Sequence, residues 1–263
     1  MNEITDLDTM IEALAEITQE DNETEPALST GEPELPTLAS VIADASPLPD
    51  EALFLGLADD GLPVLLNLFD PVPGPLLVVG DAKCGKTRLM QTIARAVDML
   101  HSPDDVKYVI ITEKPDEWQD FHNNDNNAGI FVTDESNTRE LINSLMEWAH
   151  NNKGEQQSIL LFIDDLEPIS ELDPQVEQNI RWLLLRGPAR HIWPIVSLRS
   201  NRAEAMKAWM NFFRSRLFGH IEKEEVSEQI IGTSKFDLSK LEKGSQFAML
   251  EGDNLLKFIA PSI

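Results

Sequence analysis

The sequence contains a single cysteine, Cys84, so no disulfide can form within the chain. It also lacks the features that direct a chain to a membrane or across it. No N-terminal segment combines a positively charged start with an apolar stretch, as a secretory signal peptide would. No apolar run approaches the roughly 18 residues that a membrane-spanning helix needs. These absences predict a cytoplasmic protein without membrane insertion.

Basic residues are missing from the first third of the chain. No Lys or Arg precedes Lys83, whereas residues 1–82 hold eighteen of the 46 acidic residues, and the formal net charge is −25. A generally acidic surface repels a phosphate backbone, although a local basic ring in an oligomer could survive this total. DNA therefore remains a candidate ligand that the net charge does not favour.

The N-terminal segment has two parts. Residues 4–17 carry apolar side chains at helical spacing, with acidic residues on the opposite face. The sequence then becomes acidic and rich in Pro, Thr and Ser, which is typical of a disordered linker. We expect an acidic amphipathic helix and linker over residues 1–36 and a folded domain over residues 37–263. Two interpretations of the helix stay open: it docks on a protein partner through residues 4–17, or it folds back on its own domain.

The rest of the chain alternates apolar, β-branched runs with amphipathic segments. Strands are predicted at 76–79, 106–112, 129–133, 158–163 and 191–198, and helices at 88–100, 136–152 and 176–187. This alternation is typical of an α/β fold with a mostly parallel sheet and helices on both faces. Residues 52–68 predict a hairpin before the first of these strands, with its turn at Asp59-Asp60-Gly61.

Residues 80–87, GDAKCGKT, lie between a predicted buried strand and a predicted helix. They satisfy every fixed position of the phosphate-binding loop pattern G-x-x-x-x-G-K-[ST], whose backbone N–H groups surround the phosphates of a nucleotide. In this pattern Lys86 supplies positive charge to the β- and γ-phosphate oxygens, and the Thr87 hydroxyl ligates Mg²⁺. The sequence therefore predicts ATP and Mg²⁺ as cofactors. The residues expected to bind the nucleotide are Gly80, Asp81, Ala82, Lys83, Cys84, Gly85, Lys86, Thr87 and Arg88.

A second run, ILLFIDD at 159–165, is an apolar strand that ends in two aspartates. This is the pattern of the strand beside the phosphate loop, where one acid holds Mg²⁺ and the next polarises the attacking water. We therefore predict Asp164 as a metal ligand and Asp165 as the catalytic base. The latter position more often carries Glu, and the shorter Asp side chain points to slow hydrolysis.

The sequence leaves two interpretations open for each of two further side chains, Cys84 and Trp118. Cys84 lies near a helix N-terminus, where the dipole can lower the pKa of a thiol, so it is either a redox switch or a small tolerated side chain. Trp118 either stacks on a nucleotide base or packs in the core.

The order of these motifs resembles that of the FtsK/HerA superfamily of ring-forming P-loop ATPases, which includes FtsK-type DNA translocases and the ATPases of type VII secretion. The resemblance covers most of residues 52–261, including YVIITEKPDEW at 108–118 and a closing hairpin at 243–261. It implies a homo-oligomeric ring, such as a hexamer, whose subunits share active sites. It also implies an ATP-driven motor that acts on a polymer, with DNA as the leading candidate.

The resemblance also suggests catalytic residues beyond Lys86 and Asp165. In such rings an arginine neutralises the charge that develops on the γ-phosphate, and by family position the candidates are Arg216 and Arg199. The family often has glycine where Lys83 stands, and Arg199 falls near the position of a sensing glutamine. A rival interpretation is a nucleotide-gated assembly or regulatory protein, with slow or no hydrolysis, that docks a partner through its N-terminal arm.

Overall fold

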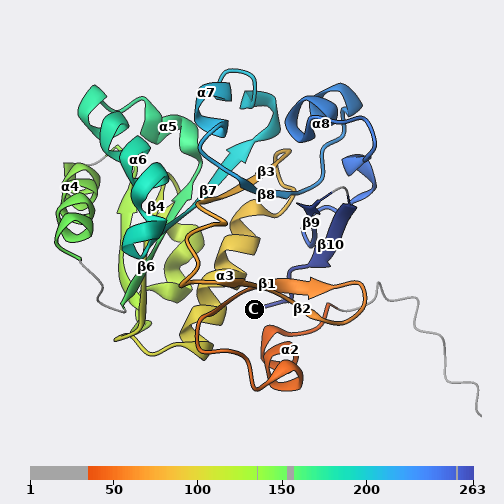
Figure 1. The fold of residues 1–263 in the computed structure, drawn as a ribbon, viewed down its shortest axis with the longest axis horizontal. Helices are drawn as coiled ribbons and strands as arrows, with labels where there is room; N and C mark the ends of the chain where they lie inside the picture. Colours follow the sequence, from red (N-terminus) through yellow and green to blue (C-terminus); the bar gives the residue numbers. More distant parts are fainter. Residues whose placement is uncertain (1–34, 135, 153–156, 253) are drawn as a thin grey trace, which may run out of the picture. The chain divides into compact units, whose positions relative to one another are not determined.

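In the computed structural model, ten strands form one sheet in the order β2-β1-β10-β9-β8-β3-β7-β6-β4-β5 (Figure 1). The structure describes residues 35–134, 136–152, 157–252 and 254–263. The helix predicted at 4–17, and the linker after it apart from residues 35 and 36, lie outside these residues. In the part of the chain that is described, no helix is both long enough and apolar enough to cross a bilayer.

Six neighbouring strands of the sheet run parallel to one another. They are β3 (Leu76–Gly80), β4 (Val106–Thr112), β5 (Asn127–Val132), β6 (Ser158–Asp164), β7 (Ile192–Arg199) and β8 (Ser215–Phe218). Each strand and helix predicted in this region is present, with ends within two residues of the expected ones. The prediction of an α/β fold with a mostly parallel sheet is therefore confirmed.

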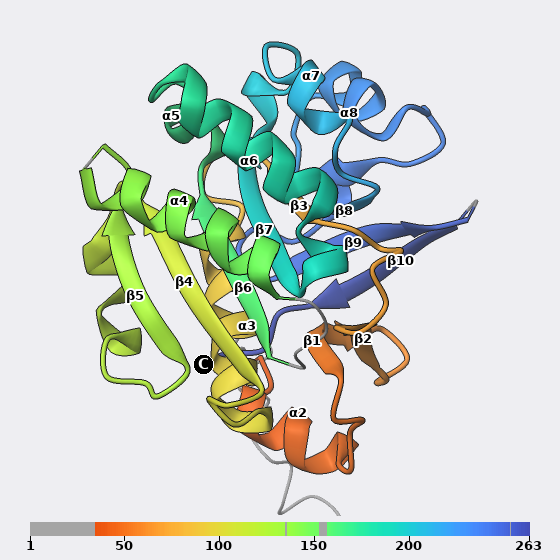
Figure 2. The same ribbon diagram turned by 60° about the vertical axis from the view of Figure 1, so that its left-hand side comes forward.

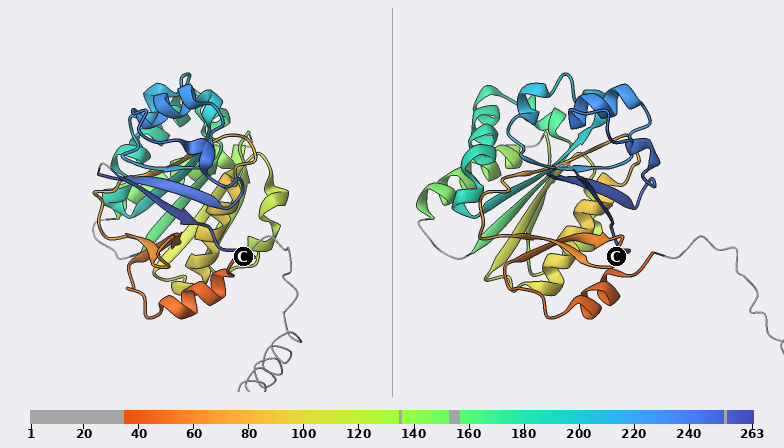
Figure 3. Two further views of the ribbon diagram at one scale, coloured as in Figure 1. Left: turned by 90° about the vertical axis from the view of Figure 1, so that its right-hand side faces the viewer. Right: turned by 45° about the vertical axis from the view of Figure 1, so that its right-hand side comes forward.

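The remaining four strands form an antiparallel extension of the sheet. They are β1 (Ala52–Ala58), β2 (Pro63–Asn67), β9 (Gln246–Glu251) and β10 (Asn254–Ile259). Both predicted hairpins are present, at the expected places in the chain. They lie side by side because β1 pairs with β10, while β9 pairs with β8 and so joins the extension to the parallel strands (Figure 3).

Helices cover both faces of the sheet (Figure 2). One face carries α3 (Lys86–Leu100) and η1 (Pro115–Phe121), and α2 (Leu38–Ala45) packs beside them under the β1-β2 hairpin. The other face carries α4 (Ser136–Asn151), α5 (Leu166–Ser170), α6 (Pro174–Arg186), α7 (Lys207–Met210) and α8 (Glu224–Ile231). Three short 3₁₀ turns connect these elements: η2 (Pro188–Arg190), η3 (Ser200–Arg202) and η4 (Leu238–Lys240).

The central strands are apolar on both faces because each face packs against helices. In β3, Leu77 and Val79 pack in the layer of α4 to α8, whereas Leu76 and Val78 pack in the layer of α3. This double burial explains why the strands appear in the sequence as continuous apolar runs rather than as alternating patterns. It also fixes the strand ends, where the polar residues of the candidate site lie.

Trp118 packs in the core on the α3 side of the sheet. Its side chain is fully buried, with ring centroids 5.4 Å from Phe121 and 6.0 Å from Phe162. A ring enclosed in this way has no face available to a nucleotide base. The placement favours the packing interpretation of Trp118 over base stacking.

Replacing Trp118 with alanine should destabilise the fold by about 3–5 kcal/mol, because it leaves a large cavity among buried aromatic rings. Urea unfolding monitored by far-UV circular dichroism measures the change. Met99→Ala is a matched truncation at a side chain that is 44% exposed, and it should change the stability by less than about 0.5 kcal/mol. Equal effects of the two variants would contradict the packing role.

Candidate nucleotide site

The predicted phosphate loop lies between β3 and α3. Gly80 is the last residue of β3, and Lys86 is the first of α3. This places the loop at the carboxyl end of a strand whose neighbours on both sides are parallel to it, which is where α/β sheets bind ligands. Gly85, just before the helix, has a φ of +96°, and a Cβ there would lie 2.6 Å from the carbonyl oxygen of Gly244. The loop conformation therefore requires glycine at this position.

The Lys86 side chain folds over the loop. Its ammonium donates hydrogen bonds to the carbonyl oxygens of Gly80 at 3.0 Å and Asp81 at 2.8 Å. These bonds hold a positive charge beside the first turn of α3, where the helix dipole adds further positive potential. The arrangement suits a phosphate group, which carries several negatively charged oxygens.

Thr87 and Asp164 contact each other although they are far apart in the sequence. The Thr87 hydroxyl donates to Asp164 Oδ2 at 2.9 Å, and the Ser197 hydroxyl donates to Asp164 Oδ1 at 2.9 Å. Burial raises the pKa of the Asp164 carboxyl, although the two hydrogen bonds oppose this shift. A divalent cation would offset the cost of a buried negative charge.

The donors at this point fit Mg²⁺ because a hydroxyl and a carboxylate are the hard oxygen ligands that this ion prefers. Over the residues that the structure describes, no group of three or more His, Cys, Asp or Glu side chains could hold a metal ion. Mg²⁺ at a nucleotide is usually held by one or two protein ligands, and phosphate oxygens and waters complete its coordination. Thr87 and Asp164 are the residues that would hold the ion.

Asp165 has a constrained backbone and an occupied carboxylate. Its φ is +87°, a region that a non-glycine residue seldom adopts, and its N–H donates to the Ser197 hydroxyl at 2.9 Å. Asp165 Oδ2 forms an ion pair with Arg199 at 2.9 Å, and Oδ1 accepts from the N–H of Glu167 at 3.3 Å. Backbone strain of this kind often accompanies functional sites.

These residues surround a cavity of about 330 Å³. Its lining comes from the phosphate loop, the start of α3, the carboxyl ends of β4, β6 and β7, and the segment from β4 into η1. The lining residues are Ala82, Lys83, Lys86, Thr87, Thr112, Glu113, Lys114, Glu117, Asp164, Asp165, Ser197 and Arg199. Seven residues of the predicted site are thus brought together: Ala82, Lys83, Lys86, Thr87, Asp164, Asp165 and Arg199.

Arg216 does not line this cavity. Its guanidinium donates to three backbone carbonyl oxygens, those of Met210 at 3.0 Å, Ile230 at 3.1 Å and Phe213 at 3.3 Å. The two arginines predicted as catalytic therefore lie in different surroundings. Arg199 reaches the site of its own chain, whereas Arg216 is held in a separate part of the domain.

Other predicted site residues do not line the cavity. The Asp81 carboxylate accepts hydrogen bonds from the Ser200 hydroxyl and from the N–H of Glu222, so it ties the loop to two neighbouring segments. The Cys84 thiol is buried, and burial raises its pKa, which is the reverse of the shift expected from the helix dipole. A buried thiol with a raised pKa suits a small packing side chain rather than a redox switch. Gly80, Gly85 and Arg88 are also absent from the lining.

Ser197 belongs to the candidate site but to none of the sequence motifs. It is the single hydroxyl in the otherwise apolar core of β7, it is 2% exposed, and it bonds to both aspartates of the acidic strand end. A lone serine near the end of a buried strand was the signal available in the sequence. This serine can be assigned to the site only once β7 is known to lie between β3 and β6.

Replacing Ser197 with alanine should weaken Mg²⁺-dependent ATP binding by about 10- to 100-fold, because Asp164 loses a partner that orients it. The change also leaves the buried N–H of Asp165 without its acceptor, which costs about 1–3 kcal/mol of stability. Calorimetric titration with and without Mg²⁺ measures the first effect, and urea unfolding measures the second. Ser197→Thr keeps the hydroxyl and should therefore retain both the Mg²⁺-dependent affinity and the stability of the wild type. Wild-type ATP affinity in the alanine variant would rule out the orienting role.

Comparisons with known proteins find similarity at the level of the fold. The sequence matches no known family model and no curated protein. Among solved structures, the fold is similar to ATPases 2 and 3 of EssC from Geobacillus thermodenitrificans, with a TM-score of 0.69 and 17% identity over 89% of this chain and 48% of that one. It is similar to the cytoplasmic domain of the type VII secretion ATPase EccC from Thermomonospora curvata, with a TM-score of 0.67 and 14% identity over 87% and 32% of the two chains.

A third similar structure is the pCW3 conjugation coupling protein TcpA, solved with ATPγS, with a TM-score of 0.64 and 14% identity over 87% of this chain and 69% of that one. The chain spans about half of the EssC structure and about a third of the EccC structure. At these identities the likeness concerns the fold. The chain therefore has the fold of the FtsK/HerA-type P-loop ATPases, as its motifs predicted.

Proposed function

We propose that this chain binds ATP with Mg²⁺ and hydrolyses it as the ATPase domain of a ring-forming motor that acts on a polymer, with DNA as the leading candidate. The observation that carries the proposal is the hydrogen bond of 2.9 Å between Thr87 and Asp164. It joins the phosphate loop to the acidic strand end, with Lys86 lining the same cavity. The similarity in fold to secretion and conjugation ATPases supports the same proposal.

Each residue has a distinct role in this proposal. The N–H groups at the start of α3 and the Lys86 ammonium bind the phosphates, and Thr87 and Asp164 hold Mg²⁺. When bound, the metal ion neutralises charge on the phosphate oxygens and orients the leaving group. Asp165 accepts a proton from the attacking water, or orients it, once its carboxylate is free to do so.

The ion pair between Asp165 and Arg199 favours a second candidate function. Both carboxylate oxygens of Asp165 have partners, so the group must leave Arg199 before it can act on a water molecule. A protein with such a site could bind ATP and turn it over slowly or not at all. The second candidate is therefore a nucleotide-gated assembly protein that docks a partner through its acidic N-terminal arm.

The proposal of a ring of subunits rests on the similarity in fold, since the structure contains a single chain. A neighbouring subunit would complete the site with a basic residue, as in other P-loop rings. Arg216 can serve in this way only if it leaves the three carbonyl oxygens that hold it. Arg199 needs no neighbour, since it already lines the cavity of its own chain.

Lys86→Ala should weaken the binding of Mg²⁺-ATP by about 10- to 100-fold, because it removes charge-assisted hydrogen bonds to the phosphates. Isothermal titration calorimetry on the full-length chain measures the affinity. Lys240→Ala is the matched control, because Lys240 is exposed and pairs only with Asp237 among the described residues. Wild-type affinity in the Lys86 variant, or equal losses in both variants, would exclude the proposed site.

ATP turnover with and without double-stranded DNA separates the two candidate functions. For a motor we expect DNA to stimulate turnover, and Lys86→Ala and Asp165→Asn to abolish it. For an assembly protein we expect tight nucleotide binding with negligible turnover in both conditions. The rate of phosphate release from the full-length protein, measured with and without DNA, distinguishes the two candidate functions. Lys240→Ala again serves as the control.

A further inference from the structure

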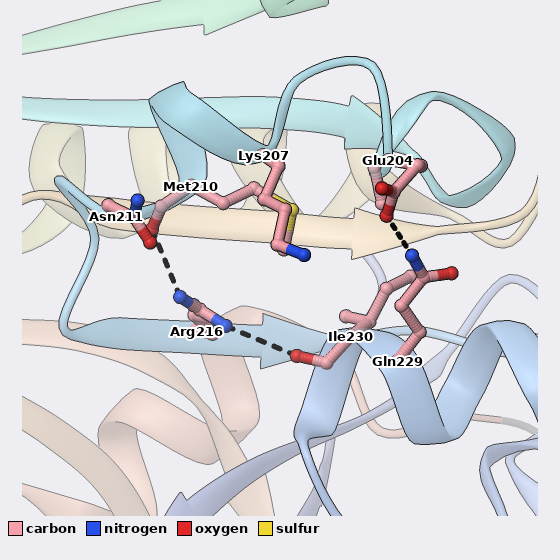
Figure 4. Close-up of a pocket in the computed structure, with 8 residues that line it drawn as sticks. Glu204, Lys207, Met210, Asn211, Arg216, Gln229 and Ile230 are labelled. Atoms are coloured by element: carbon pink, nitrogen blue, oxygen red, sulfur yellow. Dashed lines mark hydrogen bonds between the residues drawn. The ribbon is translucent and has the colours of Figure 1, made fainter.

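A second cavity, of about 200 Å³, lies between the α7 segment, β8 and α8 (Figure 4). It shares no lining residue with the nucleotide site. Its lining residues are Ala203, Glu204, Lys207, Met210, Asn211, Arg216, Gln229 and Ile230. Neither the motifs nor the proposed function gives it a role.

Arg216 enters this cavity with a fixed orientation. Three of its five N–H donors bond to the carbonyl oxygens of Met210, Phe213 and Ile230, and two N–H groups remain. Figure 4 shows the side chain between the segment of Met210 and Asn211 and the end of α8. Burial lowers the pKa of Arg216. The carbonyl bonds thus present a preorganised guanidinium rather than a freely moving surface cation.

Within the described part of the chain, neither Arg216 nor Lys207 has an acidic partner. Across the residues described, the ion pairs of the domain involve neither side chain. Two unpaired cations that line one cavity give it a positive potential, which favours an anionic ligand.

The remaining lining residues indicate which anion fits. The Glu204 carboxylate lines the cavity and accepts a hydrogen bond from the Gln229 amide, so one negative group already lies there. It would repel a phosphate dianion more strongly than a singly charged carboxylate. Ala203, Met210 and Ile230 offer apolar contacts to a carbon chain. The volume is below that of typical sites for whole cofactors, which suits a single side-chain-sized group.

We propose that this cavity binds the carboxylate of an aliphatic ligand group. Arg216 and Lys207 supply charge-assisted hydrogen bonds to the carboxylate, and the apolar lining contacts its carbon chain. The carboxylate belongs either to an acidic side chain of a polypeptide or to a small free acid, because both have the same chemistry. The site is independent of nucleotide binding and can be tested in its absence.

The test is a titration of the full-length, ¹⁵N-labelled protein without nucleotide, observed through the side-chain amide signals of Asn211 and Gln229. The probes are N-acetylglutamate α-amide, butyrate, N-acetylglutamine α-amide and inorganic phosphate. We expect both carboxylates to give saturable shifts, and the neutral amide and phosphate to bind at least about tenfold more weakly. The carboxylate that binds more tightly identifies the source, an acidic side chain or a free acid. Shifts that do not saturate, or that phosphate produces equally well, would overturn the proposal.

Two variants and a matched control locate the binding. Arg216→Gln and Lys207→Gln should each weaken the binding of the carboxylate probes about tenfold. Arg214 is exposed and lies outside this lining, so Arg214→Gln should leave the binding unchanged. Lys207 is exposed, so its variant keeps the test valid if Arg216→Gln disturbs the fold. Carboxylate affinity that Lys207→Gln leaves unchanged would place the binding elsewhere and refute the assignment.

Discussion

The site depends on the order β3-β7-β6 at the centre of a parallel sheet. Parallel strands bring their carboxyl ends to one edge, so the phosphate loop after β3 and the two aspartates at the end of β6 meet there, with β7 between them. Ser197 of β7 fills this intermediate position and bonds to both aspartates, while Arg199, two residues later, lies beside Gly80 in the strand register. The burial of both sheet faces keeps these strand ends in place, because any shift would disturb two hydrophobic layers.

The same arrangement has a cost in stability. Burial raises the pKa of Asp164 in the folded protein above its unfolded value, so the folded state favours the protonated carboxyl. Stability therefore falls as the pH rises from the unfolded pKa through the folded one, and the full cost is present above the folded pKa. The hydroxyl groups of Thr87 and Ser197 reduce this cost, and a bound cation would reduce it further. A domain with extensive hydrophobic layers on both sheet faces can tolerate such a destabilised group at its functional site.

Much of this arrangement could be predicted from the sequence because its signals are local. The phosphate loop is a contiguous motif, and the apolar strands and amphipathic helices have periodicities within short windows. The pairing of β1 with β10, which joins two hairpins from opposite ends of the domain, has no local signal. The same holds for the Asp81 carboxylate, whose partners Ser200 and Glu222 are more than a hundred residues away. The role of Ser197 likewise requires the strand order, which periodicity does not reveal.

The two arginines that the family resemblance grouped together show why position in a motif is not enough to assign a role. Arg216 has a half-buried guanidinium whose hydrogen bonds go to backbone carbonyls, and such bonds fix a side chain without pairing its charge with an anion. Arg199 is half exposed, and its charge is paired with Asp165, the residue proposed to act on water. An incoming phosphate group would compete with Asp165 for Arg199, since both are anions and both lie at the same cavity. If the chain hydrolyses ATP as proposed, the rate would depend on how the charge of Arg199 is shared between the nucleotide and Asp165, and this competition needs no residue from another subunit.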